Sequence, residues 1–142
     1  MGLIEDVLGS SDDAAEVTDE SEKQRYAILL NAGPEETSSA GNAFNYALEL
    51  DNAGHEVQLF LDGKASKWPG EFGQNPDRPF STEWERIRER GLLAGACGYC
   101  ANAFDAADAC KRSGVRLLSD SGEHAPAVAK LANEGYELMT VG

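Results

Sequence analysis

The chain has 142 residues, of which 25 are acidic and 12 are basic, so its formal net charge at pH 7 is −13. This length suits one domain with a single sizeable core. The negative charge opposes nonspecific binding to nucleic acid or to an anionic membrane, because both require positive charge on the protein.

Residues 1–24 hold eight acids and one lysine and few large apolar residues, a composition typical of a disordered segment. They lack the basic start and continuous apolar run of a secretion signal, and no run in the chain approaches the roughly 20 apolar residues that span a bilayer. We therefore expect an acidic, disordered tail on a soluble cytoplasmic protein with no membrane partner. The acidic, lysine-poor composition also suggests a halophilic source.

The domain predicted for residues 25–142 begins with two strands around a helix. “YAILLNAG” at 26–33 and “HEVQLFLDG” at 55–63 read as buried strands. Between them, small and apolar residues recur every three or four positions from 40 to 48, which predicts one helix face. “NAG” at 52–54 is a typical helix end.

Residues 62–80 are rich in glycine and proline, which predicts a long loop. This loop carries Trp68, Phe72 and Phe80. Such aromatic side chains can form a lid or a subunit contact, or they can pack on their own domain, and the sequence leaves both open. “STEWERIRERG” at 81–91 predicts a helix capped by Ser81.

The last part of the chain alternates strands and helices again. “LLAGAC” at 92–97, “VRLLS” at 115–119 and “YELMTV” at 136–141 read as strands, and apolar stripes predict helices between them. Cys110 continues one such stripe and is expected in the core. Five strands alternating with helices predict a three-layer α/β/α sandwich with a mainly parallel sheet. In such folds, chemistry gathers at the carboxyl ends of the strands.

Cys97 lies at the C-terminal end of the third predicted strand, where the chain turns into a helix, and Cys100 follows within reach. Backbone N–H groups at a helix start stabilise a thiolate relative to the thiol, which makes Cys97 a candidate nucleophile. One alternative is that both cysteines are simply small buried residues. Another is that they form a reversible disulfide pair. A thioredoxin fold is disfavoured, because the motif follows the third strand rather than an early one.

A zinc site commonly needs two CxxC pairs, or one pair with two histidines at ligand spacing. This chain has one CxxC pair, and His55 and His124 lie far apart. We therefore predict no metal ion and no cofactor.

Three further residues are candidates for substrate binding. Asn31 and Ser38 follow the first strand, where a helix start can bind a small anion, although ordinary turn and cap roles explain them as well. His124 begins the last predicted helix after a strand end. It either faces the same rim as Cys97 or is a solvated helix-start histidine.

Two segments carry a family resemblance: “YAILLNAGPEETSSAGNAFNYALELDNAGHEVQLFLDG” and “GLLAGACGYCANAF”. They resemble the DsrE/TusD-like (DsrE/DsrF-like) family of small sulfur-relay proteins, over residues 25–142. The resemblance implies a five-stranded α/β sandwich that usually oligomerises. It also implies a persulfide carrier at Cys97 and a protein sulfur donor or acceptor as partner, and Cys100 is then the expected helper. The alternative is a non-catalytic oligomeric scaffold or binding module of the same fold.

Overall fold

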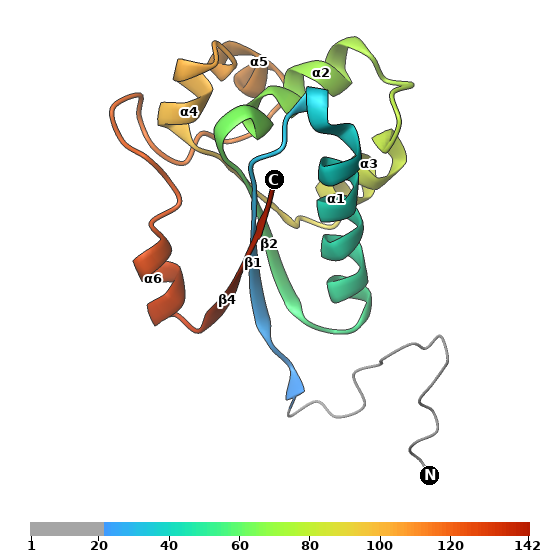
Figure 1. The fold of residues 1–142 in the computed structure, drawn as a ribbon, viewed down its shortest axis with the longest axis vertical. Coiled ribbons are helices and arrows are strands. Elements are labelled where there is room, and N and C mark those ends of the chain that lie inside the picture. The colour runs from blue at the N-terminus through green and yellow to red at the C-terminus, as the bar shows by residue number, and fades with distance from the viewer. Residues whose placement is uncertain (1–21) are drawn as a thin grey trace.

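Four parallel strands form the centre of the structure, a computed structural model that describes residues 22–142 (Figure 1). The strands are β1 (Arg25–Leu30), β2 (Glu56–Leu61), β3 (Leu93–Ala96) and β4 (Tyr136–Val141). Their order in the sheet is β3-β2-β1-β4, and every pair is parallel. The predicted acidic tail lies outside the described residues except for its last three positions.

Helices cover both faces of this sheet, which confirms the predicted α/β class with a parallel sheet. In chain order the helices are η2 (Pro34–Glu36), α1 (Thr37–Asn52), η3 (Gly63–Lys67), α2 (Trp68–Gln74), α3 (Ser81–Glu89), α4 (Gly98–Ala103), α5 (Ala107–Arg112) and α6 (Val128–Asn133). Helices α1 and α3 lie on one side of the sheet and α6 on the other, whereas α2, α4 and α5 gather at the carboxyl ends of the strands (Figure 1). Among the described residues, no helix is both long and apolar enough to cross a membrane.

The sheet has four strands rather than the five predicted, because residues 115–119 do not form a full strand. Leu117 makes a single parallel bridge with Ala96. The Ala96 N–H donates to the Arg116 carbonyl at 2.9 Å, and the Leu118 N–H donates to the Ala96 carbonyl at 2.8 Å. Strand β3 ends at Ala96, where the chain turns into α4, so pairing with residues 115–119 cannot extend further.

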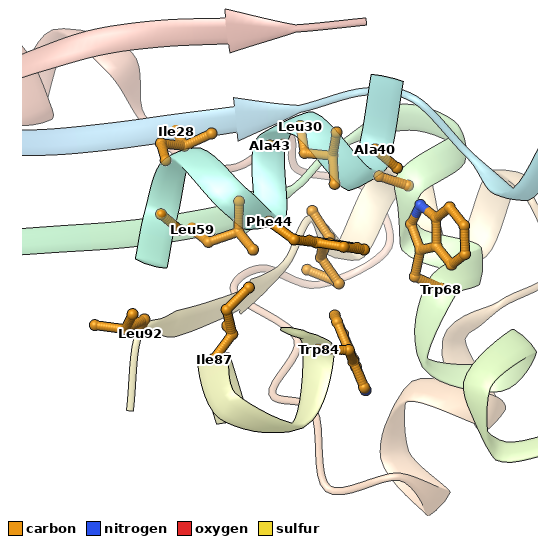
Figure 2. Close-up of a cluster of buried hydrophobic side chains, with 14 of the residues drawn as sticks. Ile28, Leu30, Ala40, Ala43, Phe44, Leu59, Trp68, Trp84, Ile87 and Leu92 are labelled. Carbon is orange, nitrogen blue, oxygen red and sulfur yellow. The ribbon is translucent and has the colours of Figure 1, made fainter. Parts of the chain in front are cut away.

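The main core lies between the sheet and helices α1, α2 and α3 (Figure 2). Ile28, Leu30 and Leu59 project from the strands toward Phe44 of α1, and the Phe44 ring lies 5.8 Å from the rings of both Trp68 and Trp84. The remaining buried members include Ala40, Ala43, Ala47, Leu48, Val57, Leu61, Ala65, Phe72, Ile87, Leu92, Ala96, Cys110 and Val115. The prediction that Cys110 belongs to the core is thus confirmed.

The prediction of a loop over residues 62–80 is wrong for most of that segment, because η3 and α2 occupy residues 63–74. Trp68 is fully buried, and its indole Nε1–H donates to the Ala32 carbonyl at 2.8 Å. Phe72 stacks on both Trp68 and Trp84. These two aromatic side chains therefore pack on their own domain and form neither a lid nor a subunit contact.

Phe80 is half-buried and lies directly against Gly41 of α1, where a Cβ would come within 2.2 Å of the ring. Phe80 adopts a left-handed backbone conformation immediately before α3. Ser81 is consequently the first residue of that helix and does not cap it, which corrects the predicted serine cap.

The opposite face of the sheet has a smaller apolar cluster, made by Ala27, Leu29, Phe60, Leu131 and Tyr136. Between this face and residues 116–136 lies a depression of about 400 Å³. Phe60, Leu118, His124 and Ala125 are among the residues that line it. The depression reaches the carboxyl ends of the strands, so it adjoins the region where function was expected.

Candidate functional site

The carboxyl ends of three neighbouring strands meet at one edge of the sheet. Asn31, Asp62 and Cys97 directly follow β1, β2 and β3. The Cys97 N–H donates to the Leu61 carbonyl at 2.9 Å, which ties the end of β3 to the end of β2. This edge is where ligands gather in parallel α/β sheets.

The Cys97 sulfur accepts hydrogen bonds from two backbone amides. Cys97 is the N-cap residue of α4, and its Sγ lies 3.3 Å from the Cys100 N and 3.3 Å from the Ala125 N. Because α4 has only six residues, these direct N–H contacts matter more than any dipole of the whole helix. Two backbone N–H donors are therefore aimed at one sulfur atom, where they can stabilise negative charge that develops on it during a reaction.

Residues 119–125 form a cover over the Cys97 sulfur. The Gly98 N–H donates to Ser119 Oγ at 3.0 Å, and Ser119 Oγ donates to the Glu123 carbonyl at 2.5 Å. The Gly98 backbone lies so close to Ser119 that a Cβ on Gly98 would come within 1.8 Å of the Ser119 carbonyl oxygen. As a result, Cys97 has no exposed surface.

Cys100 differs from Cys97 in its hydrogen bonds. Its Sγ–H donates to Asp62 Oδ1 at 3.1 Å. Burial, with the Asp62 carboxylate accepting this proton, raises the pKa of Cys100 to about 12. Cys100 therefore stays a neutral thiol near neutral pH, with its proton directed at Asp62.

Asp62 and His124 complete the cluster. His124 Nε2 lies 2.9 Å from Asp62 Oδ1, which also accepts the Gly63 N–H at 2.9 Å. The His124 side chain is 51% exposed and the Asp62 side chain only 15%. One ligand atom from each of Asp62, Cys97, Cys100 and His124 lies within 4.8 Å of the others.

The predicted site residues differ in how near they lie to this cluster. Cys97, Cys100 and His124 come together. Asn31 lies at its margin, because its Oδ1 is 3.1 Å from where a Cβ on Gly63 would be. Ser38 is exposed in the first turn of α1, and within residues 22–142 it makes no hydrogen bond to the cysteines.

Sequence reasoning missed Asp62, although its position directly after β2 follows the same rule that identified Cys97. The Asp62-Gly63 pair was interpreted as the start of a loop. His55, the second histidine of the chain, lies elsewhere: its Nδ1 accepts the Gln24 N–H at 3.0 Å, beside the amino ends of the strands.

Cys110 is outside the cluster. It is fully buried on α5, its Sγ lies 3.4 Å from the Ser66 carbonyl oxygen, and burial raises its pKa to about 11. These properties are those of a structural thiol.

The comparisons with known proteins agree with this organisation. The model of the DsrE/DsrF-like family matches residues 24–141. The chain belongs to this family. Its DsrE-like domain includes all four strands and all four residues of the cluster, and the family commonly functions in sulfur relay with partner proteins. A search of curated proteins gave no match.

Proposed function

We propose that this DsrE-like protein is a sulfur-relay protein in which Cys97 carries sulfur as a persulfide. The observation that carries the proposal is the pair of backbone N–H groups, of Cys100 and Ala125, that donate to the Cys97 sulfur at the edge of the sheet. These donors are placed to stabilise the negative charge that sulfur exchange develops on this atom.

Loading is an exchange in which one S–S bond breaks and another forms. The Cys97 thiolate attacks the outer sulfur of a donor protein's persulfide, and the donor cysteine leaves as a thiolate. The reaction conserves oxidation state overall, so it needs no external oxidant or reductant. Delivery repeats the exchange: an acceptor thiolate takes the outer sulfur and Cys97 leaves as a thiolate.

Cys100 is proposed as the helper of Cys97. As its proton moves along the hydrogen bond to Asp62, its sulfur can attack the inner sulfur of the Cys97 persulfide, which forms a Cys97–Cys100 disulfide; the outer sulfur leaves as hydrosulfide and takes up a proton to give hydrogen sulfide. The two Sγ atoms lie within 4.8 Å of each other, so this step requires only a small movement. It provides a route by which an unused persulfide is discharged.

Sulfur transfer requires that the cover over Cys97 opens. Residues 119–125 form that cover, and Ser119, His124 and Ala125 also line the neighbouring depression. We infer that a partner approaches from this side. His124 at the rim is the proposed substrate-contacting residue, with Asn31 at the margin and Ser38 further away as the weaker candidates.

We further infer a cytoplasmic protein that works as a homo-oligomer with a protein sulfur donor or acceptor. All three cysteines of the chain are free, as expected in a reducing compartment. The family relation supports the partner protein.

The persulfide proposal is tested by mass spectrometry after incubation with a cysteine desulfurase and cysteine. We expect the wild-type protein to gain the mass of one sulfur atom on the peptide with Cys97. Cys97→Ser should abolish this gain, and Cys110→Ser, the control, should retain it. An unmodified Cys97, under conditions that load a known carrier, would refute the relay.

The second candidate function is a non-catalytic binding or scaffold module. It is favoured by one observation, the complete burial of the Cys97 side chain. In that case a small alkylating reagent should modify Cys97 in the folded protein no faster than it modifies Cys110. Faster modification of Cys97 would instead show that the cover opens.

A further inference from the structure

Four side chains with metal-binding atoms converge at the carboxyl edge of the sheet, although they come from distant parts of the chain. Asp62 follows β2, Cys97 and Cys100 surround the start of α4, and His124 lies before α6. Their ligand atoms are two sulfurs, one imidazole nitrogen and one carboxylate oxygen, all within 4.8 Å of one another. Sequence spacing gave no sign of this set, because only the fold brings His124 to the CxxC pair.

We propose that Asp62, Cys97, Cys100 and His124 form a four-ligand site for a thiophilic divalent cation, with Zn²⁺ as the best match. This replaces the prediction of no metal ion, which rested on sequence spacing alone. The proposal is independent of the sulfur relay, since it requires only that the four ligand atoms surround one ion.

The geometry suits a tetrahedral ion. Zn–S bonds of about 2.3 Å and Zn–N or Zn–O bonds of about 2.0–2.2 Å place tetrahedral ligands roughly 3.3–3.8 Å apart. Asp62 Oδ1 now lies 2.9 Å from His124 Nε2 and 3.1 Å from Cys100 Sγ, because hydrogen bonds hold these atoms together. All four ligand atoms already lie within 4.8 Å of one another, so modest movements of the side chains would bring them to tetrahedral separations.

The chemistry of the four ligands selects the ion. Thiolate sulfur and imidazole nitrogen favour Zn²⁺ over Mg²⁺ or Ca²⁺, which prefer oxygen. On binding, the thiol protons pass to water as the Zn–S bonds form. Outer hydrogen bonds that orient ligands are already present: the Cys100 and Ala125 amides on the Cys97 sulfur, and the Gly63 amide on Asp62.

Access to the site is available on one side. His124 is half-exposed and lines the depression of about 400 Å³, whereas the two cysteines are buried. An ion would therefore enter from the His124 side, where the cover of residues 119–125 has to open.

Four protein ligands leave no open coordination position, as in structural rather than catalytic zinc sites. A bound ion would also occupy the Cys97 sulfur. Metal binding and persulfide formation at Cys97 are then mutually exclusive states of the same pocket.

The direct test is titration of the reduced, metal-free full-length protein with Co²⁺ under anaerobic conditions. We expect the intense visible bands of tetrahedral Co²⁺ and a thiolate-to-metal charge-transfer band in the near ultraviolet, both saturating at one equivalent. Zn²⁺ should then displace Co²⁺ and remove these bands. A weak octahedral spectrum without thiolate bands, as the many carboxylates of the chain would give, overturns the proposal.

A matched pair of histidine variants tests the ligand set. His124→Ala should lower the affinity for Zn²⁺, measured by competition with a chromophoric chelator, by more than about 100-fold, since loss of even an outer partner costs about 10–100-fold. His55→Ala, the control, should bind like the wild type. Equal affinity of wild type and His124→Ala overturns the assignment of His124, and His124 is exposed enough for this variant to fold.

The proposed metal site and the proposed sulfur relay can be tested by separate measurements. One equivalent of Zn²⁺ should slow alkylation of Cys97 by at least about tenfold in the wild type, and a strong chelator should restore the rate. This readout involves no sulfur donor, so it is unaffected by the outcome of the persulfide experiment. Equal alkylation rates with and without Zn²⁺ count against the site.

Discussion

Gly98 is the position at which the backbone after Cys97 comes closest to the cover of residues 119–125. No side chain fits there, because a Cβ would lie 1.8 Å from the Ser119 carbonyl oxygen, and the neighbour is backbone that cannot rotate away. The same contact lets the Gly98 N–H donate to Ser119 Oγ. A single glycine thus determines how tightly the cover lies over the Cys97 sulfur.

Gly98→Ala is expected to reduce the free energy of unfolding by about 1–3 kcal/mol, the usual cost of overpacking. Urea unfolding followed by circular dichroism measures the change. Gly122→Ala is the matched control, since a Cβ there meets no atom within 4 Å, and its effect should stay within about 0.5 kcal/mol. Equal stability of the two variants would contradict the tight contact.

The elements with clear apolar periodicity were predictable from the sequence, and those whose stability depends on tertiary packing were not. β1, β2, β4 and α1 follow from runs or stripes of apolar residues. Helix α2 was missed, because Pro69, Gly70 and Gly73 have low helix propensity. Burial of Trp68 and Phe72 in the aromatic core outweighs that cost, and a proline is tolerated in the first turn.

The candidate site was also only partly predictable from the sequence. The strand-end rule identified Cys97 and Cys100 and suggested His124. It did not identify the contact between His124 and Asp62, which are 62 residues apart. Only the irregular path of residues 119–127, which carries no periodic signal, brings them together.

Helix α5 is held against η3 in part by Cys110, whose sulfur lies 3.4 Å from the Ser66 carbonyl oxygen. The pKa of Cys110 is about 11 in the folded protein and about 8.5 when the chain is unfolded. As pH rises above about 8.5, the unfolded state loses this proton while the folded state keeps it, so stability falls. This loss of stability levels off near pH 11, where the Cys110 thiol also ionises in the folded protein.

Relative to Cys110→Ser, the wild type should therefore lose about 1–2 kcal/mol of unfolding free energy between about pH 8 and about pH 10. Paired urea unfolding experiments at both pH values measure this difference. The contribution of Cys100, with its raised pKa, is common to both proteins and cancels. A constant difference across this range would show that the Cys110 thiol ionises freely in the folded state.

At the scale of the whole molecule, the dominant property is its net charge of −13. The ion pairs within residues 22–142 mostly join exposed side chains, such as Arg25 with Glu56 and Lys64 with Glu36, and solvent-exposed pairs stabilise a fold only slightly. They do not offset the mutual repulsion of excess carboxylates, which opposes the compact state.

The melting temperature is accordingly expected to rise when KCl is increased from about 0.1 M to about 1 M, as the screening length falls from about 10 Å to about 3 Å. Differential scanning fluorimetry measures this directly. Sodium and lithium chloride should act alike, because screening depends on ionic strength. A melting temperature that stays constant or falls would argue against charge repulsion as the main electrostatic effect on stability. It would also argue against the expected halophilic source.

The Ala125 amide that donates to the Cys97 sulfur lies 28 residues further along the chain. During synthesis, Cys97 therefore leaves the ribosome well before the residue that completes its surroundings. Over that interval the nascent thiol lacks this donor and its cover, and is open to oxidants and stray electrophiles. The surroundings of Cys97 are therefore complete only after residues 119–125 have been synthesised and have packed against the start of α4.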